Sequence, residues 1–483
     1  MLGDDASTQM SDELGPLDVL LYRSEANPRT GSAVIGVELL ESTPEWGRFC
    51  NQFDQASRRV LRLRQKVVVP ILPTTPPRWV IDSEFDLSHH VQRTDLGGDG
   101  TLRDVFDLAE TIGVTPIDLS RPLWRVTLVE GLKGGQSAVI LHISHAITDG
   151  VGGVEMLSNI YDNEADPPSK PDTPTPAGQE LSPLDVTRQG LRKMPANAIT
   201  QIKEIAATGI DAIGKLVSSP AEQISGAVGI AAAAARKMRS GIERSPLLAD
   251  RGDATRSDAI DIGFPNLRRA AKAAGGTLND AYLAGVTGTL RRYHQAMGTD
   301  TRVISIGVPV SVRSDIDEAG SNHFTAVNVA APLSEADPVQ CISNISTQMA
   351  SLREDLGFDV VSLVAPLLSS LPPVVFQSLT GLVDIAAAVQ ASNVPMYPHD
   401  TYLAGAKVLR QYGIGPLPGT ALMFLMITRA GNCTVTVRYD TASVTDPELF
   451  AQCMQEAFDD VLALGDPPAR CVPVTFHDSR GGQ

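Results

Sequence analysis

The sequence predicts an α/β protein built of two lobes. From Gly15 onward, strand-like pieces such as Ser32–Leu40 alternate with helical pieces such as Glu45–Arg62. A proline-rich stretch, Asp166–Pro183, then interrupts regular structure, and a second alternating series begins near Asp253. With 483 residues, the chain is about three times as long as a typical domain, which leaves room for two hydrophobic cores.

The remaining strands of the first lobe are followed by a helical connection. Lys66–Pro70 and Arg125–Val129 are short β-rich pieces, and Ser137–Ile143 is an uninterrupted apolar run typical of a fully buried strand. In Val186–Arg244, isoleucines recur near helical spacing beside several lysines and arginines. This stretch is either a crossover helix packed on the lobes or a basic amphipathic surface that lies on an anionic membrane.

The second lobe repeats the alternation of helices and strands. Helices are predicted over Asn279–Tyr293 and Pro447–Leu464. The predicted strands are Thr301–Val312, Thr325–Ala331 and Thr434–Tyr439. The predicted division of the chain is an N-terminal lobe at residues 1–166, a linker with a helical crossover at 167–250, and a C-terminal lobe at 251–483.

The composition narrows the class of function. Lysine and arginine number 40 against 56 aspartates and glutamates, a net charge of −16 with no long basic stripe, so we expect no nucleic-acid partner. Five scattered cysteines without a C-x-x-C pair fit a reducing compartment. The first ten residues are acidic where a secretory signal would be basic and then apolar. We therefore expect a cytoplasmic protein.

One uncharged stretch, Val360–Val383, is long enough on paper to cross a bilayer. It contains Pro366, Pro372 and Pro373, which interrupt a continuous helix. We expect buried or interfacial helical pieces here rather than a membrane span.

The most informative segment is Gln136–Gly153, where the apolar run ends in a cluster of polar residues. On a strand, His142 and Ser144 face one side and His145 the other, so the two histidines do not converge and no metal site is predicted. An imidazole titrates near neutral pH, which makes His145 the candidate to take a proton from a hydroxyl or thiol. The alternative is an ordinary hydrogen-bonded histidine at a strand end.

The segment His145–Gly150 resembles the H-x-x-x-D-G element of the CoA-dependent acyltransferase superfamily, which includes chloramphenicol acetyltransferase and peptide-synthetase condensation domains. Nearly the whole chain resembles the bacterial wax ester synthase/acyl-CoA:diacylglycerol acyltransferase family. The matching pieces occur in the family's order and are Gly15–Asp18, Pro77–Val80, Phe85–Leu87, His89–Val91, Arg121–Trp124, Leu278–Asp280, Pro309–Arg313, Ser321–Asn322 and Ser392–Pro395.

The resemblance implies a fold of two chloramphenicol-acetyltransferase-like lobes, each a mixed sheet with flanking helices, joined by the helical crossover. It implies an O-acyltransferase that moves a long-chain acyl group from acyl-CoA to diacylglycerol, and also to fatty alcohols. No cofactor is implied, because acyl-CoA is a co-substrate. Diacylglycerol or a long-chain alcohol is the second partner, and the lipid acceptor implies peripheral contact with the inner membrane face or with lipid droplets.

The resemblance also implies roles for the residues of the motif. His145 would deprotonate the acceptor hydroxyl. Asp149 is similar to a structural brace that pairs with an arginine, and Arg313 is the expected partner. Gly150 would allow a backbone geometry that a Cβ would hinder.

Other residues are expected to support the site or bind substrate. Asn279 and Asp280 resemble a supporting element, or else they cap the helix that follows. Ser392 and Asn393 are expected to contact substrate. Trp124 is assigned to substrate binding by its motif, although packing in the core is the interpretation that its residue type favours.

Two positions depart from the family pattern. Ser144 stands where the family has a first histidine before His145, and Met396 stands where it has a glycine after Pro395. The bulkier Met396 would narrow the acceptor pocket. Two alternatives therefore stay open. The first is a non-catalytic relative that binds acyl-CoA or lipid. The second is an acyltransferase with another acceptor, such as an amine or a polyketide hydroxyl.

Overall fold

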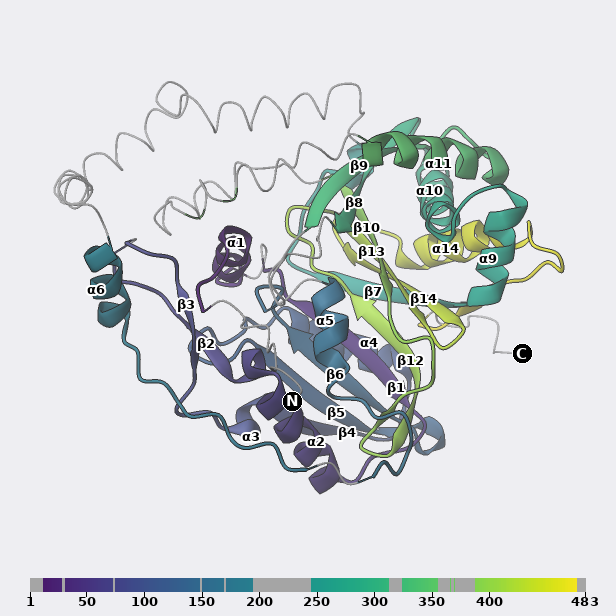
Figure 1. Cartoon of the computed structure of the whole chain (residues 1–483). Coiled ribbons are helices and arrows are strands. Elements are labelled where there is room, and N and C mark those ends of the chain that lie inside the picture. Colours follow the sequence, from purple (N-terminus) through teal and green to yellow (C-terminus); the bar gives the residue numbers. More distant parts are fainter. Residues whose placement is uncertain are drawn as a thin grey trace, which may run out of the picture.

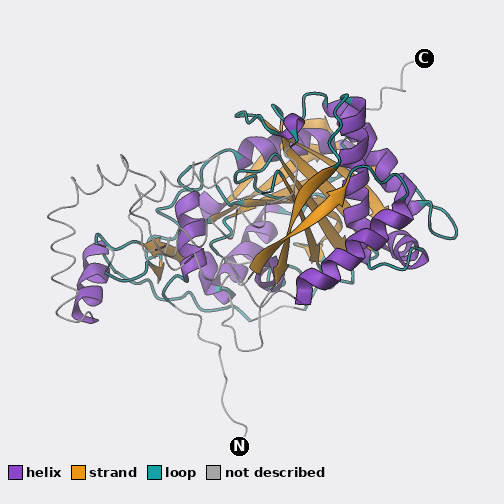
Figure 2. Cartoon of the chain, turned by 90° about the horizontal axis from the view of Figure 1, so that it is seen from above, coloured by secondary structure: helices purple, strands orange, loops and turns teal. Residues whose placement is uncertain are grey.

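The computed structural model describes residues 12–27, 31–72, 74–147, 150–168, 171–193, 245–311, 324–354, 365, 369 and 387–475. Two central β-sheets with helices packed against them form the body of the molecule (Figures 1 and 2). Most of Val186–Arg244 and of Val360–Val383 lies outside these residues. Among the helices that are described, none combines the length and the apolar character needed to cross a bilayer.

The first sheet has six strands in the order β11-β12-β1-β6-β5-β4. Their bounds are β1 Val34–Leu40, β4 Val91–Gly100, β5 Trp124–Leu132, β6 Ser137–Ile143, β11 Tyr402–Leu403 and β12 Ala406–Ile414. The predicted apolar strand is confirmed as β6, which pairs antiparallel with β1 on one side and β5 on the other. Because β6 is central, the residues that follow it emerge from the middle of the sheet.

Strands β11 and β12 belong to the first sheet, which the predicted division of the chain did not anticipate. Both strands come from the segment predicted as the C-terminal lobe, yet β12 pairs antiparallel with β1, with Ile35 opposite Ile414. The apolar residues of β12, such as Tyr412, extend the core that β1 and β6 form. The division of the chain at residues 166 and 250 stays a prediction. It leaves out that β11 and β12, from the predicted C-terminal lobe, complete the first sheet.

Helices cover both faces of the first sheet. The helices of this part of the chain are α1 Pro16–Ser24, α2 Trp46–Arg59, α3 Leu87–His90, α4 Leu102–Gly113, α5 Gly150–Leu157 and α6 Pro183–Lys193, with short 3-10 turns η1 Leu61–Arg64 and η2 Lys133–Gly135. Phe49 and Phe53 of α2 pack on one face of the sheet, and Phe106 of α4 packs on the other. A separate hairpin, β2 Gln65–Val68 and β3 Arg78–Ile81, lies beside α6.

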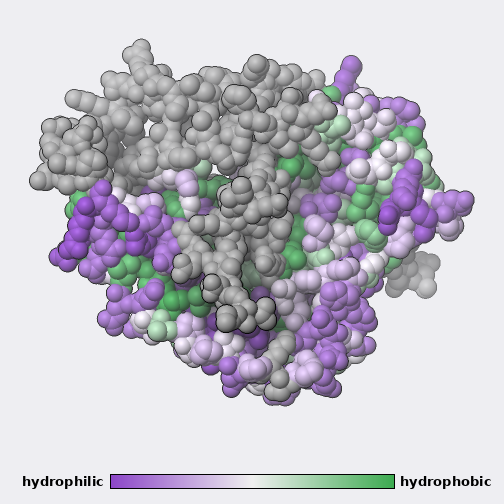
Figure 3. Space-filling model, viewed as in Figure 1, coloured by the Kyte–Doolittle hydropathy of each residue, from purple (hydrophilic) through white to green (hydrophobic). Residues whose placement is uncertain are grey.

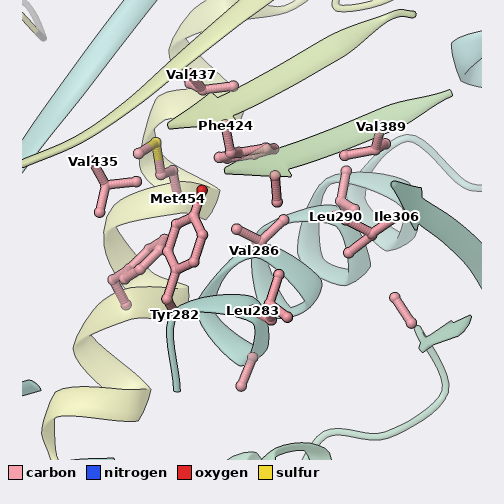
Figure 4. Close-up of a cluster of buried hydrophobic side chains, with 14 of the residues drawn as sticks. Tyr282, Leu283, Val286, Leu290, Ile306, Val389, Phe424, Val435, Val437 and Met454 are labelled. Atoms are coloured by element: carbon pink, nitrogen blue, oxygen red, sulfur yellow. The ribbon is translucent and has the colours of Figure 1, made fainter. Parts of the chain in front are cut away.

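The second sheet has seven strands in the order β15-β7-β14-β13-β10-β8-β9. Its strands are β7 Thr255–Gly263, β8 Val303–Ser311, β9 Phe324–Pro332, β10 Val389–Pro395, β13 Leu422–Arg429, β14 Asn432–Asp440 and β15 Val472–Pro473. The helices of this part are η3 Pro246–Leu248, α9 Phe264–Ala273, α10 Leu278–Ala296, α11 Pro338–Glu354 and α14 Pro447–Leu462. In Figure 4, Leu283 and Val286 of α10 and Met454 of α14 meet Phe424 of β13 in the core between sheet and helices.

A buried network of charges joins helix α4 of the first lobe to the second sheet. Arg103 of α4 donates to the carboxylate of Asp258 on β7 (2.9 Å), and Tyr439 donates to the other oxygen of the same group (2.6 Å). Arg438 of β14 pairs with Glu110 of α4 at 2.9 Å. Asp258 is fully buried, and its charge is balanced by Arg103 and by Arg256, whose Nε lies 3.3 Å from the Asp258 carboxylate. Helix α4 is therefore held by the sheet of each lobe at once.

Candidate functional site

The turn after β6 holds His145 in a fixed position. The hydroxyl of Ser144 accepts a hydrogen bond from the Ala146 amide (3.1 Å), and the carbonyl of Ser144 accepts one from the Ile147 amide (3.1 Å). Ala146 and Ile147 are buried in the core of the first lobe, whereas His145 is half-buried. The imidazole is therefore carried by a backbone that two buried side chains and two hydrogen bonds immobilise. A general base needs this kind of positioning.

A buried carboxyl group lies directly behind this turn. Glu25, which follows α1, is 4% exposed and accepts hydrogen bonds from Ser144 (2.6 Å) and Ser32 (2.7 Å) at the same oxygen. Burial raises the pKa of the Glu25 carboxyl, while the hydrogen bonds from the two serines oppose that rise. Ser144, the first departure from the family pattern, thus links the turn to the end of α1 through its hydrogen bond to Glu25.

Glu25 was not among the predicted site residues. It lies 119 positions from Ser144 in the chain, and it is one of 56 acidic residues. Local pattern gives no reason to single it out.

Replacing Glu25 with alanine should lower turnover without removing the candidate base. The Ser144 hydroxyl would lose its acceptor, and an unsatisfied buried group costs about 1–3 kcal/mol, so the turn that carries His145 should loosen and kcat should fall by roughly 10-fold or more. The matched control is Ser32→Ala, which removes a donor from the same carboxyl group but leaves Ser144 in place. Equal kcat values for the two variants would contradict a role for Glu25 in holding the turn.

Two of the predicted site residues, Asp149 and Arg313, lie outside the described part of the chain, so their expected pairing stays a prediction. The matching piece Ser321–Asn322 lies outside it as well. Gly150 is the first residue of α5. Tyr397 donates a hydrogen bond to the Val154 carbonyl within this helix (2.7 Å), which ties α5 to the segment that follows β10 of the second sheet.

Asn279 and Asp280 lie in the first turn of α10, and the helix cap is neither of them. Thr277 is the N-cap: its hydroxyl accepts from the Asp280 amide (3.2 Å), and the Asp280 carboxylate accepts from the Thr277 amide (2.8 Å). This reciprocal pair is a capping box. Asp280 thus acts on its own helix, three positions after the true cap.

The predicted substrate residues Ser392 and Asn393 lie on opposite faces of β10. Asn393 stands opposite Met426 on the face that packs against the helices, and its buried Oδ1 has no hydrogen-bond partner in the described part of the chain. Ser392 stands opposite Leu425 on the other face. Strand β10 pairs with β8 only at Val389 and Gln390, so Ser392 and Asn393 follow the point where the two strands part.

An apolar cluster shares the face of Ser392. It consists of Met423, Leu425 and Ile427 of β13, against which Val394, Met396 and Leu417 pack. Met396, the second departure from the family pattern, thus packs against buried side chains, and a Cβ at Gly413 of β12 would clash with Leu425 on the same face.

Trp124 lies in the core of the first lobe. Its indole nitrogen donates to the Leu63 carbonyl (2.7 Å), and its ring stacks on His90 with centroids 4.7 Å apart. The side chain is 4% exposed, and these contacts satisfy its one polar group and cover its ring. The core interpretation is the one that the geometry supports, and the assignment of Trp124 to substrate binding gains no support.

His142 is buried near the end of β6, close enough to Arg438 of the second sheet for that charge to affect it. Burial, and to a lesser extent the charges of Arg125 and Arg438, lower its pKa to about 4. Its Nε2 is buried without a hydrogen-bond partner among the described residues. Histidine, cysteine and acidic side chains do not gather in threes anywhere in the described ranges, so His142 has no partners for a metal there.

The titration of His142 predicts how stability depends on pH. Below its ordinary pKa near 6.5, the unfolded chain binds a proton at His142, while the folded chain stays neutral down to pH about 4. The free energy of unfolding should therefore fall by about 2 kcal/mol between pH 7.5 and 5 from this group alone. In urea unfolding, His142→Gln should lose less stability over that interval than the parent. Parallel pH profiles would contradict a neutral buried imidazole.

Comparisons with known proteins identify the family of the chain. A family model described as the wax ester synthase/diacylglycerol acyltransferase catalytic domain matches residues 6–282, and the WS/DGAT C-terminal domain matches residues 320–461. A Mycobacterium tuberculosis protein named "putative diacylglycerol O-acyltransferase" is 52% identical, over 98% of this chain and 96% of its own length. A Mycobacterium bovis protein of the same name is 28% identical over 82% of this chain and 86% of its own.

Solved structures share the fold. A wax ester synthase/diacylglycerol acyltransferase from Marinobacter aquaeolei VT8 aligns with a TM-score of 0.64 at 19% identity, covering 93% of this chain and 98% of that one. The first condensation domain of the calcium-dependent antibiotic synthetase aligns with a TM-score of 0.59 at 14% identity, covering 96% and 98%. The two-lobed architecture predicted from the sequence is confirmed by these alignments.

Proposed function

The chain belongs to the wax ester synthase/diacylglycerol acyltransferase family, and from this premise we propose that it transfers a long-chain acyl group from acyl-CoA to the hydroxyl of diacylglycerol. The observation that carries the proposal is the half-buried His145 on a turn that Ser144 and the core immobilise. The name of the 52% identical relative gives the same acceptor.

The chemistry needs one base and no covalent enzyme intermediate. His145 takes the proton of the acceptor hydroxyl as the hydroxyl oxygen attacks the thioester carbonyl. The tetrahedral intermediate collapses, the carbon–sulfur bond breaks, and the proton held on His145 passes to the departing thiolate of CoA. The products are an ester and free CoA, and atoms and charge balance without a metal or redox partner.

The family supports a second class of acceptor, because its model is described by both wax ester synthesis and diacylglycerol acyl transfer. Diacylglycerol and long-chain alcohols both present methylene chains, which an apolar site distinguishes poorly. We therefore propose long-chain alcohols as second acceptors, and contact with the inner membrane face or lipid droplets as the route by which such acceptors arrive.

The proposal is tested by release of CoA from palmitoyl-CoA, with diacylglycerol and hexadecanol offered separately. We expect CoA release that depends on acceptor and is faster with diacylglycerol. A folded protein that binds palmitoyl-CoA but releases no CoA with either acceptor would overturn the proposal in favour of a non-catalytic lipid-binding relative. Release with an amine acceptor alone would favour a different acceptor class.

A further inference from the structure

Helix α6 is attached to the loop between β2 and β3. The Thr187 hydroxyl accepts from the Ile71 amide (2.9 Å), and the Thr74 hydroxyl donates to the Thr187 carbonyl (3.1 Å). Val186 packs with the valines of the small sheet, and a Cβ at Gly190 would come within 2.5 Å of Thr74. These contacts define which side of α6 faces the protein and leave its opposite side to solvent.

Apolar side chains are exposed where the loop and the helix meet. Ile71 is 65% exposed, Leu72 is 38% exposed and Leu184 of α6 is 43% exposed. Only six large hydrophobic residues are exposed in the described part of the chain, and half of them lie in this one small unit. In Figures 1 and 2, α6 and the small sheet lie at one end of the molecule, away from the two central sheets.

Cations lie beside these apolar residues. Leu184, Arg188 and Arg192 follow one another at intervals of four, so they share one exposed face of α6. The Arg188 side chain is 61% exposed and its nearest carboxylate, that of Asp185, is 3.7 Å away, a loose and solvated pair. Figure 3 shows hydrophobic residues among hydrophilic ones on this flank. We call Ile71, Leu72, Leu184, Arg188 and Arg192 the hairpin–α6 surface.

We propose that the hairpin–α6 surface docks the protein on an anionic lipid surface. Isoleucine and leucine side chains enter the boundary between headgroups and acyl chains, while arginines bind the lipid phosphates from above. The inference deepens the proposed function and rests on it in one respect, since an enzyme whose acceptor dissolves in lipid has to meet that lipid.

Charge is the reason to favour an anionic lipid over a neutral one. The chain carries a net charge of −16, so an anionic membrane repels the molecule as a whole and binding needs a local cationic face. Each arginine near such a membrane strengthens binding, and salt weakens that contribution. Binding should therefore require anionic lipid and decline as salt is raised.

The test measures co-sedimentation of the full chain with vesicles of phosphatidylcholine alone and of phosphatidylcholine mixed with phosphatidylglycerol. The parent should bind the anionic vesicles and not the neutral ones. The double variant Arg188→Glu/Arg192→Glu should bind anionic vesicles roughly 30-fold more weakly or worse, since two favourable charges become repulsive. Ile71→Asp/Leu72→Asp should lose binding to a similar degree.

Control variants carry a single substitution of the same kind at an exposed position elsewhere, Arg302→Glu (side chain 70% exposed) and Val472→Asp (61% exposed), and each is compared with the corresponding single variant, Arg188→Glu or Ile71→Asp. Both should bind like the parent. Equal binding by parent and hairpin–α6 variants, equal binding to neutral and anionic vesicles, or a parent that binds neither would overturn the inference.

A second readout separates this inference from the proposed function. With a short-chain diacylglycerol that disperses in water, every variant should release CoA at the parent rate, because the hairpin–α6 surface does not touch the reacting atoms. Absence of turnover in the parent, together with the expected pattern of vesicle binding, would refute the proposed function and leave the docking surface standing.

Discussion

His145→Ala should reduce CoA release with diacylglycerol by about 100- to 10,000-fold, the range that general acid–base catalysis contributes. The residual rate would come from binding and orientation of the two substrates, which the substitution leaves in place. Because Ala146 and Ile147 anchor the turn in the core, loss of the half-buried imidazole should not change the fold.

The matched control is His89→Ala, which removes an imidazole that is 49% exposed at the end of α3. Its rate should equal that of the parent. Binding of palmitoyl-CoA, measured by calorimetry, should be alike in parent, His145→Ala and His89→Ala. A His145→Ala enzyme that retains more than a tenth of parental kcat would show that another group accepts the proton.

Asp258→Ala should have the largest effect on stability. Asp258 is fully buried and accepts hydrogen bonds from Arg103 and Tyr439, so its removal leaves the Arg103 guanidinium in the interior without its buried counter-charge. Breaking a buried ion pair from one side costs about 3–5 kcal/mol. The urea midpoint of unfolding should fall accordingly.

Asp107 offers a control on the same arginine. Its carboxylate also binds Arg103, at 2.7 Å, but its side chain is 63% exposed. Asp107→Ala should therefore cost at most about 1 kcal/mol, as exposed ion pairs do. If the two alanine variants unfold at the same urea concentration, Asp258 does not stabilise the contact between α4 and the second sheet.

Local sequence pattern predicted the elements that depend on local chemistry. The apolar run at Ser137–Ile143 forms β6 at those bounds, because a strand buried on both faces has to be apolar throughout. The predicted helix at Asn279–Tyr293 is α10, which begins one residue earlier. The prediction that Asn279 and Asp280 cap this helix was wrong, because the N-cap is Thr277 and Asp280 completes a capping box three positions later.

Contacts between distant parts of the chain were beyond such patterns. The hydrogen bond between Glu25 and Ser144 depends on how α1 packs against the end of β6, and no spacing rule connects them. The face of β10 on which Ser392 and Asn393 lie follows from its register with β13, which the isolated segment does not specify. The motif therefore identified His145, and only the fold identified what holds it.

Strand β12 has a consequence for how the protein is made. Ile35 pairs with Ile414, so the first sheet stays unfinished until nearly the whole polypeptide has left the ribosome. Until then β1 has an open edge, which invites pairing with other chains. The first lobe therefore cannot complete its fold during synthesis before the second lobe has been made. Expressing the two family-matched segments separately would yield an N-terminal fragment that lacks two strands of its own sheet, β11 and β12.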